Sequence, residues 1–246
     1  MHNVIEIFNA FNVLNDEWIK PLISGTALTF SLTILALIMG FCLAIILTYA
    51  LYTQTMFKAL AKGFIFFTRS VPLLVQIFLL YYGSAQFEWL RNSVLWEILQ
   101  YPFSCALIAL ALNSSAYTAV LLQQNINCIP KGEIEACILL NMSLYTRMRK
   151  ILLPRVLSTF WPVYSNEAMM VLKSTSLVST ITLMDLMGVT RQIIAKTFQW
   201  DVLIITGILY FLMSALLVGF FNQLCHNVRN DGTSKRFFSN DCSSCN

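Results

Sequence analysis

Two strongly polar side chains and a lysine interrupt an otherwise apolar stretch of the sequence. Asn166 and Glu167 fall within a run that starts near Thr159, and Lys173 follows six residues later. A central acid costs about 3 kcal/mol on insertion scales, so such residues face a protein interior or a cavity. In a cavity, Glu167 would face the ammonium or guanidinium of a zwitterionic solute. The alternative is a structural hydrogen bond between spans, and the residue types leave both open.

The residues after Glu167 predict a break in the same stretch. Lys173 lies roughly 120° around a helix from Glu167, so the two are not expected to neutralise each other within it. The lysine would instead pair with a neighbouring span or extend to a membrane surface. Thr175 and Ser176 are residue types that cap a new helix, which predicts a hinge. The residues of a candidate substrate pathway are Gln76, Asn166, Glu167, Lys173, Thr175 and Ser176.

A second group of candidate residues lies in a polar, basic insert that runs from Ile129 to Pro154. Pro130 can start a helix, and Glu135 falls in its first turns, where the helix dipole favours acids. Asn141 is expected to end that helix, because asparagine tolerates the left-handed conformation. A second helix is expected over about 143–152, ending before the proline. Two short helices bent at Asn141 predict a projecting helical hairpin.

Neither an active site nor a metal site is indicated. The two histidines, His2 and His226, lie at the chain ends, and no catalytic constellation occurs within the apolar runs. Cys242 and Cys245 have C-x-x-C spacing, but no second Cys/His pair stands nearby to complete four ligands. There is no G-x-x-x-x-G-K-[ST] loop, so the chain is not expected to hydrolyse ATP. A membrane enzyme or assembly factor is therefore disfavoured.

The composition predicts an all-α, polytopic membrane protein. Hydrophobic residues make up 57% of the chain and charged residues 11%, against about 25% charged in soluble domains. Several apolar runs reach the roughly 20 residues that a spanning helix needs. The five expected spans are about Leu22–Leu51, Gly63–Gly83, Phe103–Leu122, Thr159–Leu172 with an apolar continuation to Gly188, and Val202–Leu224.

Lysine and arginine residues gather on one side of these spans, which predicts the orientation. The loops on that side carry Lys58, Lys62, Arg69, Lys131, Arg147, Arg149, Lys150, Arg155, Arg229, Lys235 and Arg236. The opposite loops hold few basic residues, diluted by acids. The basic side is therefore expected to be cytoplasmic, with residues 1–21 periplasmic and residues 225–246 a disordered cytoplasmic tail. The membrane domain would span residues 22–224, with the polar insert at about 125–155.

Four motifs, in matching order and spacing, resemble the permease subunits of bacterial ABC importers for polar amino acids, those for histidine, arginine and glutamine among them. The resemblance covers about Gly25 to Leu224. The motifs are residues 69–76 (RSVPLLVQ) with 81–83 (YYG), residues 129–132 (IPKG) with 135–136 (EA), residues 166–167 (NE), and residues 173–179 (KSTSLVS).

The resemblance implies a role for each group of residues. The polar insert is similar to the family's "EAA" loop, the docking site of an ATPase, which implies coupling roles for Gly132, Glu135, Ala136, Asn141, Ile151, Leu153 and Pro154. Pro72 would kink the second span and Arg69 would anchor its end. Gln76, one turn beyond the proline, would either satisfy a freed carbonyl or line the pathway.

The resemblance also implies the partners. These are a dimer of ATPase subunits that binds ATP and Mg, a second permease that is identical or related, and a periplasmic binding protein. The solute would be a basic amino acid, with glutamine or another polar amino acid as the alternative, and no nucleic acid is involved. An ion-coupled carrier or channel is disfavoured, because no inverted repeat is visible.

The sequence departs from the family pattern at three positions. The family usually has glycine where Asn141 stands, and we expect the bend to survive because asparagine tolerates it. It often has an acid and an arginine where Val120 and Gln123 fall. The paired loss avoids an orphaned charge in the membrane and bears on substrate identity or regulation rather than on the fold.

Overall fold

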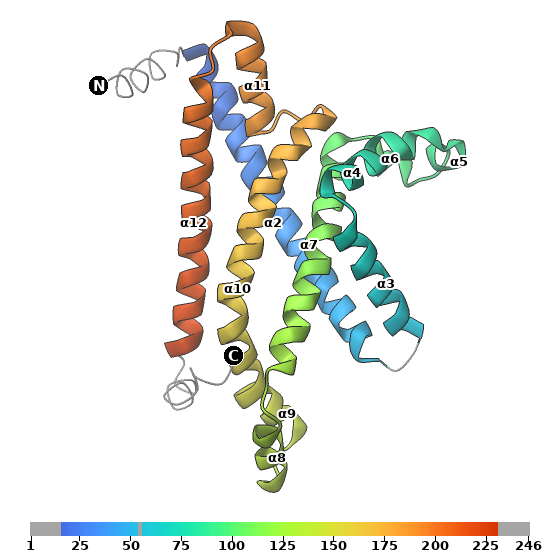
Figure 1. The fold of residues 1–246 in the computed structure, drawn as a ribbon, viewed down its shortest axis with the longest axis vertical. Helices are drawn as coiled ribbons and strands as arrows, with labels where there is room; N and C mark the ends of the chain where they lie inside the picture. The colour runs from blue at the N-terminus through green and yellow to red at the C-terminus, as the bar shows by residue number, and fades with distance from the viewer. Residues whose placement is uncertain (1–15, 54–55, 231–246) are drawn as a thin grey trace.

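The computed structural model describes residues 16–53 and 56–230, which are built from helices and their connections (Figure 1). Three helices are each long and apolar enough to cross a membrane: α2 (Asp16–Tyr52), α7 (Pro102–Asn127) and α12 (Val202–Asn230). Two further pairs of helices qualify only if each bent pair counts as one span, which gives up to five spans. The five apolar runs predicted from the sequence therefore correspond to three straight helices and two broken ones.

The second span is broken more strongly than a proline kink. Helix α3 (Met56–Ser70) ends just before Pro72, and the chain resumes as α4 (Leu73–Phe78) and a π-helical turn, η1 (Leu79–Gly83). The two halves make an angle of 105°. The predicted break at Pro72 is present, but the expectation of one helix over Gly63–Gly83 is wrong. Proline has no N–H to donate and its ring clashes with the preceding turn, so the helix stops there.

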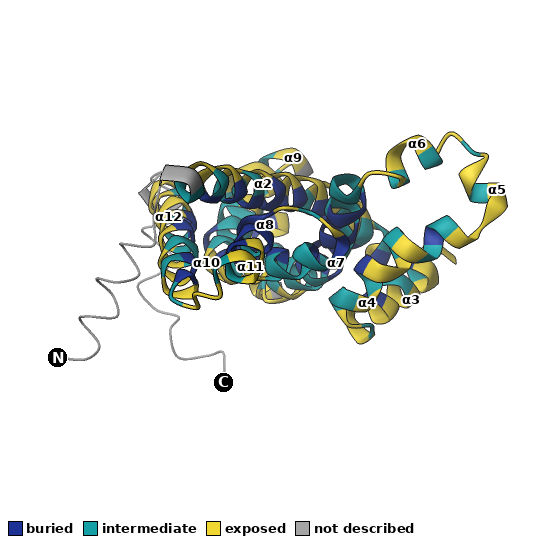
Figure 2. Cartoon of the chain, turned by 90° about the horizontal axis from the view of Figure 1, so that it is seen from above, coloured by how far each residue is buried: buried dark blue, intermediate teal, exposed yellow. Residues whose placement is uncertain are grey.

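After the break the chain forms a small arm that projects sideways from the bundle (Figures 1 and 2). It comprises η2 (Ser84–Gln86), α5 (Glu88–Arg91) and α6 (Trp96–Leu99). Trp89 and Val94 on this arm are 70% and 81% exposed. The arm lies at the opposite end of the molecule from the segment 131–152.

The fourth span differs from expectation at its start. Helix α9 (Leu144–Arg147) continues without interruption through a π-helical turn, η3 (Met148–Leu152), into α10 (Leu153–Ser174). The prediction that the second short helix ends before Pro154 is therefore wrong. In the widened turn the Leu153 amide bonds to the carbonyl of Met148, five residues earlier, and this turn accommodates Pro154, which has no N–H to donate.

The fourth span also breaks later than predicted. Helix α10 passes through the 3-10 segment η4 (Thr175–Ile181), and the chain bends by 49° before α11 (Leu186–Thr197). Thr175 and Ser176 do not cap a helix. Their hydroxyls donate to the carbonyls of Leu172 (2.6 Å) and Lys173 (2.7 Å), which continues the helical path.

The cap of α11 is Asp185, whose Oδ1 accepts a hydrogen bond from the Gly188 amide at 2.9 Å. The sequence predicted the hinge, but ten residues too early.

The ends of two further helices also differ from the predicted spans. Helix α12 continues to Asn230, so the first residues of the segment expected to be a disordered tail are helical. Helix α7 extends five residues beyond Leu122. Residues 1–15 of the expected periplasmic segment, and the Cys242/Cys245 pair, lie outside the described residues.

The core is held together by aromatic side chains where α2, α10 and α12 meet. Phe160 is fully buried, and its ring stacks on Tyr164 with centroids 5.1 Å apart. Phe41 of α2 and Phe221 of α12 pack on Tyr164 from either side, at 5.7 and 5.5 Å. The Tyr164 hydroxyl donates to the Leu37 carbonyl at 3.3 Å, which satisfies the one polar atom of this ring.

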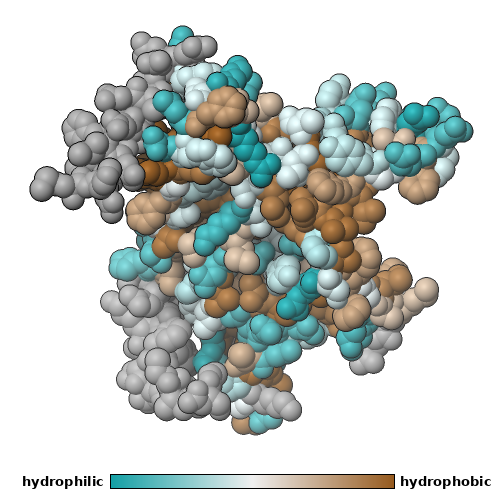
Figure 3. All heavy atoms as spheres, turned by 45° about the horizontal axis from the view of Figure 1, so that its top comes forward, coloured by the Kyte–Doolittle hydropathy of each residue, from teal (hydrophilic) through white to brown (hydrophobic). Residues whose placement is uncertain are grey.

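Apolar side chains also cover the outside of the bundle. Exposed positions alternate with buried ones along every long helix (Figure 2), and hydrophobic surface gathers between the two ends of the molecule (Figure 3). Ile46 on α2, Phe66 on α3 and Leu216 on α12 are each more than 60% exposed. Such an apolar surface suits hydrocarbon rather than water. The helices can lie in lipid because their backbone groups form hydrogen bonds within each helix.

Candidate functional site

The segment 131–152 forms the predicted helical hairpin at one end of the molecule (Figure 1). Helix α8 (Lys131–Leu139) ends at Asn141, which has a φ of +52°. The Asn141 amide donates to the Ile138 carbonyl at 2.9 Å and the Met142 amide to the Cys137 carbonyl at 3.1 Å. This pair of hydrogen bonds is the Schellman arrangement that closes a helix on a left-handed residue. The left-handed bend predicted at Asn141 is present.

Asn141 is a position where the side chain limits the bend, which gives a direct prediction. Asn141→Val is expected to destabilise the hairpin by about 1–2 kcal/mol, since a branched side chain disfavours positive φ. Asn141→Gly is expected to leave it unchanged or slightly more stable. Hydrogen exchange at the Met142 amide measures this: faster exchange in the valine variant alone supports the prediction, and equal exchange in both variants contradicts it.

The hairpin is fastened to the span that follows it by an ion pair. Arg155, in the first turn of α10, donates to the carboxylate of Glu133 on α8. Both side chains are about three-quarters buried, so this contact is more firmly defined than a surface pair. It is the only ion pair among the described residues. The ion pair therefore links α8 to the first turn of α10.

The predicted coupling residues divide into two sets in the structure. The first set consists of exposed residues on the hairpin: Gly132, Glu135, Ala136 and Asn141. Ile151 and Pro154 are half-buried at its base, and Leu153 is 50% exposed there.

Three adjacent aliphatic residues surround the exposed set: Ile138, Leu139 and Leu140 are 58%, 87% and 75% exposed. So large an apolar group at a polar end of the molecule is typical of a surface that contacts another protein.

The break at Pro72 is closed by Gln76. Its Nε2 donates to the Thr68 carbonyl at 2.7 Å and to the Val71 carbonyl at 2.8 Å, on the far side of the break. Of the two roles predicted for Gln76, the structure supports satisfaction of freed carbonyls. Both amide hydrogens are used in this way, so Gln76 has only its carbonyl oxygen left for any solute.

Arg69 lies at the end of α3, next to the same break. Its guanidinium stands over the ring of Tyr117 on α7, with 5.0 Å between the guanidinium carbon and the ring centroid. Such a cation–π contact holds the planar group in place without a counter-ion. Arg69 is also within electrostatic range of Glu167 on α10. The break, the arginine and the acid therefore belong to one region of the membrane domain.

The remaining pathway candidates lie on α10 and the segment after it. Asn166 is exposed and Glu167 is half-buried, and neither forms a side-chain hydrogen bond or an ion pair within the described residues. Lys173 is exposed and lines a cavity of about 610 Å³ between α10 and α12, together with Ser176 and Ser214. Lys173 and Glu167 do not pair, as predicted. The structure thus places Gln76 and Arg69 at the Pro72 break, with Glu167 in electrostatic range of Arg69, and leaves Lys173 and Ser176 at a different cavity.

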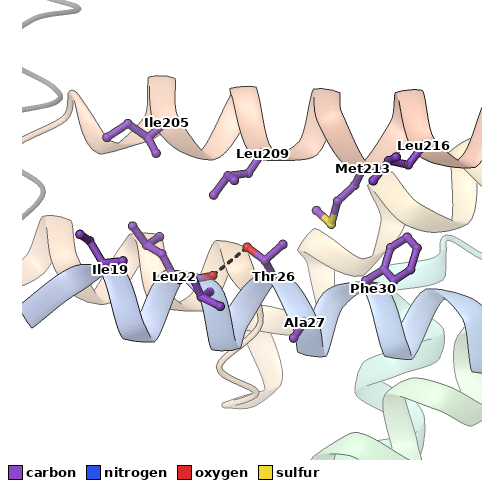
Figure 4. A pocket seen from close by; sticks show the side chains of 10 residues that line it. Ile19, Leu22, Thr26, Ala27, Phe30, Ile205, Leu209, Met213 and Leu216 are labelled. Carbon is purple, nitrogen blue, oxygen red and sulfur yellow. Dashed lines mark hydrogen bonds between the residues drawn. The ribbon is translucent and has the colours of Figure 1, made fainter. Parts of the chain in front are cut away.

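A second cavity, of about 530 Å³, has no chemistry for a polar solute. It lies between α2 and α12, and Figure 4 shows aliphatic side chains of the two helices facing each other across it. Thr26 is its one hydroxyl residue, and this hydroxyl already donates to the Leu22 carbonyl at 2.7 Å. The cavity is therefore not a candidate for the pathway.

The sequence did not reveal a buried clasp that holds the start of α11 on α2. Asp185 is fully buried, and Thr29 of α2 accepts a hydrogen bond from the Leu186 amide at 3.0 Å. Gly25 permits this approach, since a Cβ there would lie 3.1 Å from the Leu186 Cα. Gly188 permits the turn itself, since a Cβ there would lie 2.6 Å from the Leu183 carbonyl oxygen. The sequence contains a signal for this cap, because Asp185 directly precedes an amphipathic segment and an aspartate is a preferred N-cap residue. Gly188 follows three residues after it.

An all-helical bundle with two broken spans and a projecting hairpin is shared with solved transporters of the ATP-binding cassette class. An amino acid ABC transporter crystallised with histidines has a chain that superposes with a TM-score of 0.75 at 27% identity, covering 86% of this chain and 95% of that one. The fold is that of a type I ABC importer permease.

The sequence gives the same answer more specifically. Residues 36–229 match the family described as the inner membrane component of binding-protein-dependent transport systems, and the chain belongs to that family. It is 38% identical to the nopaline transport system permease protein NocM of Agrobacterium fabrum (strain C58), over 79% of this chain and 82% of NocM. It is 39% identical to the arginine permease protein ArtM of Haemophilus influenzae (strain Rd), over 78% of this chain and 84% of ArtM. The chain is thus a non-enzymatic, multi-pass membrane subunit of an ABC importer.

Proposed function

We propose that this chain forms half of the membrane pathway of an ATP-driven importer for basic amino acids, with arginine as the leading substrate. The permease class follows from the family and the fold. The substrate class is supported by the arginine permease ArtM among the relatives and by Glu167, an acid inside the membrane domain whose carboxylate has no ion-pair partner among the described residues. A cationic side chain would supply that partner.

The pathway needs further subunits, since the described part of this chain provides at most five spans. A second permease, identical or related, would complete it. Two ATPase subunits would bind ATP and Mg and dock on the hairpin, with Glu135 and Ala136 at the contact. A periplasmic binding protein would deliver the solute at the opposite end.

Closure of the ATPase dimer would press on α8, and the Glu133–Arg155 ion pair would pass this movement to α10, which carries Glu167. The pathway would then alternate between its two openings.

Copurification tests the partners. The tagged chain, extracted in mild detergent, is expected to bring down an ATPase subunit and a second permease. The ATPase is expected to be lost from a Glu135→Lys, Ala136→Arg double variant, while the second permease remains. If the wild-type chain purifies alone from cells that express the ATPase, the proposed assembly is wrong.

Orientation follows from the basic residues and has its own test. Alkaline phosphatase is expected to be active when fused after Ser93, in the arm, and inactive when fused after Ser143, in the hairpin. The enzyme folds only on the oxidising side of the membrane, so activity reports the periplasm. The reverse pattern would place the hairpin outside and exclude its contact with a cytoplasmic ATPase.

A further inference from the structure

A third cavity, of about 430 Å³, has two cations and no carboxylate among the described residues that line it. It lies between α3 and α7 next to the end of α2. Lys62 and Arg69 come from α3, and Gln123 comes from α7. Other described residues of the lining are Phe66, Ser70, Tyr117 and Val120. Two positive charges, one amide and two hydroxyl groups therefore line the same cavity.

Neither cation is neutralised by an ion pair within the described part of the chain. Arg69 is held over Tyr117 rather than against an acid, and Glu167 acts on it only from α10, outside the cavity lining. Val120 and Gln123 of α7 also line the cavity. Here they contribute no negative charge, so the cavity keeps a net positive lining in a part of the molecule where lone charges are costly.

The spacing of the two cations suits a single phosphate group. Lys62 and Arg69 are seven residues apart, which places them on one face of α3 with a rise of about 10 Å. Both side chains are long and exposed, so their charged ends can converge on a group between them. Arginine binds phosphate with a bidentate fork and lysine with a mobile point charge. Gln123 and Ser70 offer additional donors.

The surroundings of the cavity favour a lipid over a small soluble anion. Phe66, in the lining, is 75% exposed, and Phe67 and Leu60 on the same helix are each 58% exposed. The exposed Phe66 ring gives the cavity an apolar border suited to an acyl chain, while Phe67 and Leu60 lie on the other side of α3. Basic pockets between membrane helices are known to receive anionic headgroups.

We propose that the cavity between α3 and α7 binds the phosphate of an anionic phospholipid, whose headgroup bridges Lys62 and Arg69 and supplies a counter-charge that no described residue of the lining provides. The lipid would fasten the free end of α3, beside the Pro72 break, to α7. This goes beyond the transport function and does not depend on which solute is carried.

The test uses the assembled transporter in nanodiscs that contain equal amounts of phosphatidylglycerol and phosphatidylcholine with the same acyl chains. Lipids that stay bound after extraction are counted by native mass spectrometry. The wild type is expected to retain phosphatidylglycerol about fivefold over phosphatidylcholine, and Lys62→Gln is expected to remove most of that preference. Gln123→Glu is expected to remove it as well, by bringing a carboxylate to Arg69. Lys58→Gln is the matched control, because Lys58 is one turn away on α3 and does not line the cavity.

Three outcomes would overturn the proposal. One is equal retention of both lipids by the wild type, and another is an equal effect of Lys58→Gln and Lys62→Gln, which would indicate only diffuse surface charge. The third is inorganic phosphate binding to the wild type in discs of pure phosphatidylcholine and displacing phosphatidylglycerol from mixed discs, which would make the site one for a free anion. Copurification of the ATPase with each variant shows separately that the transporter has assembled.

Discussion

Glu135→Lys is expected to abolish amino acid uptake while the chain still inserts and pairs with its second permease. Glu135 is exposed on the hairpin and forms no ion pair with the described residues, so the change should not disturb the fold of the chain. Reversing a charge at the centre of a protein contact costs roughly 2 kcal/mol or more, about thirtyfold in affinity. Uptake of radiolabelled arginine by cells expressing the complete transporter measures the effect.

Glu88→Lys provides the matched control. It makes the same charge change on α5, in the arm at the opposite end of the molecule, and should leave the contact with the ATPase intact. In proteoliposomes, the Glu135→Lys transporter is expected either to hydrolyse ATP at its basal rate without transport, or to have lost its ATPase subunits during purification. If the Glu135 variant retains uptake within twofold of wild type, the hairpin is not part of the surface that docks the ATPase.

Ala136 distinguishes docking by close approach from docking by charge alone. Ala136→Trp adds bulk without charge at an exposed position, so it should impair uptake as strongly as Glu135→Lys only if a partner surface covers this side of α8. An exposed, solvated hairpin would tolerate it with a change in stability below about 0.5 kcal/mol. The three exposed aliphatic residues beside it already indicate that this side is not simply solvated.

The features that the sequence predicted correctly are those that local chemistry decides. Asn141 ends its helix because its own backbone preference permits a positive φ, and no distant residue is needed. Pro72 breaks its span and Gln76 satisfies the freed carbonyls within a few residues of the break. The hydrophobic runs locate the spans because the helix period and the membrane thickness are fixed.

The errors arise where tertiary packing selects among local options. Thr175 and Ser176 are good caps, yet the helical path continues past them. The bend comes instead at Asp185, where Gly25 lets α2 approach and Thr29 receives the Leu186 amide. Pro154 should have ended a helix, but one π-helical turn absorbs the lost hydrogen bond.

The contacts of the candidate site are the least predictable part. Glu133 and Arg155 are 22 residues apart, and no sequence period links them. Arg69 and Tyr117 meet only because α3 packs on α7. The sequence proposes residues for the site by their type, whereas the partners of these residues depend on how the broken spans pack.

Glu167→Gln is expected to lower the uptake of arginine about ten- to hundredfold while affecting citrulline much less. Citrulline has nearly the shape of arginine but carries an uncharged ureido group, so the pair isolates the contribution of the positive charge. Removing one partner of a charged hydrogen bond costs about 1.5–3 kcal/mol, which corresponds to that range.

Glutamine keeps the size of the side chain, and Glu97→Gln in α6 makes the same change away from the pathway as a control. An equal loss for arginine and citrulline would mean that Glu167 supports the packing of α10 rather than recognising the solute. If uptake stays full and the ratio of arginine uptake to citrulline uptake is unchanged, another residue or the second permease recognises the cation.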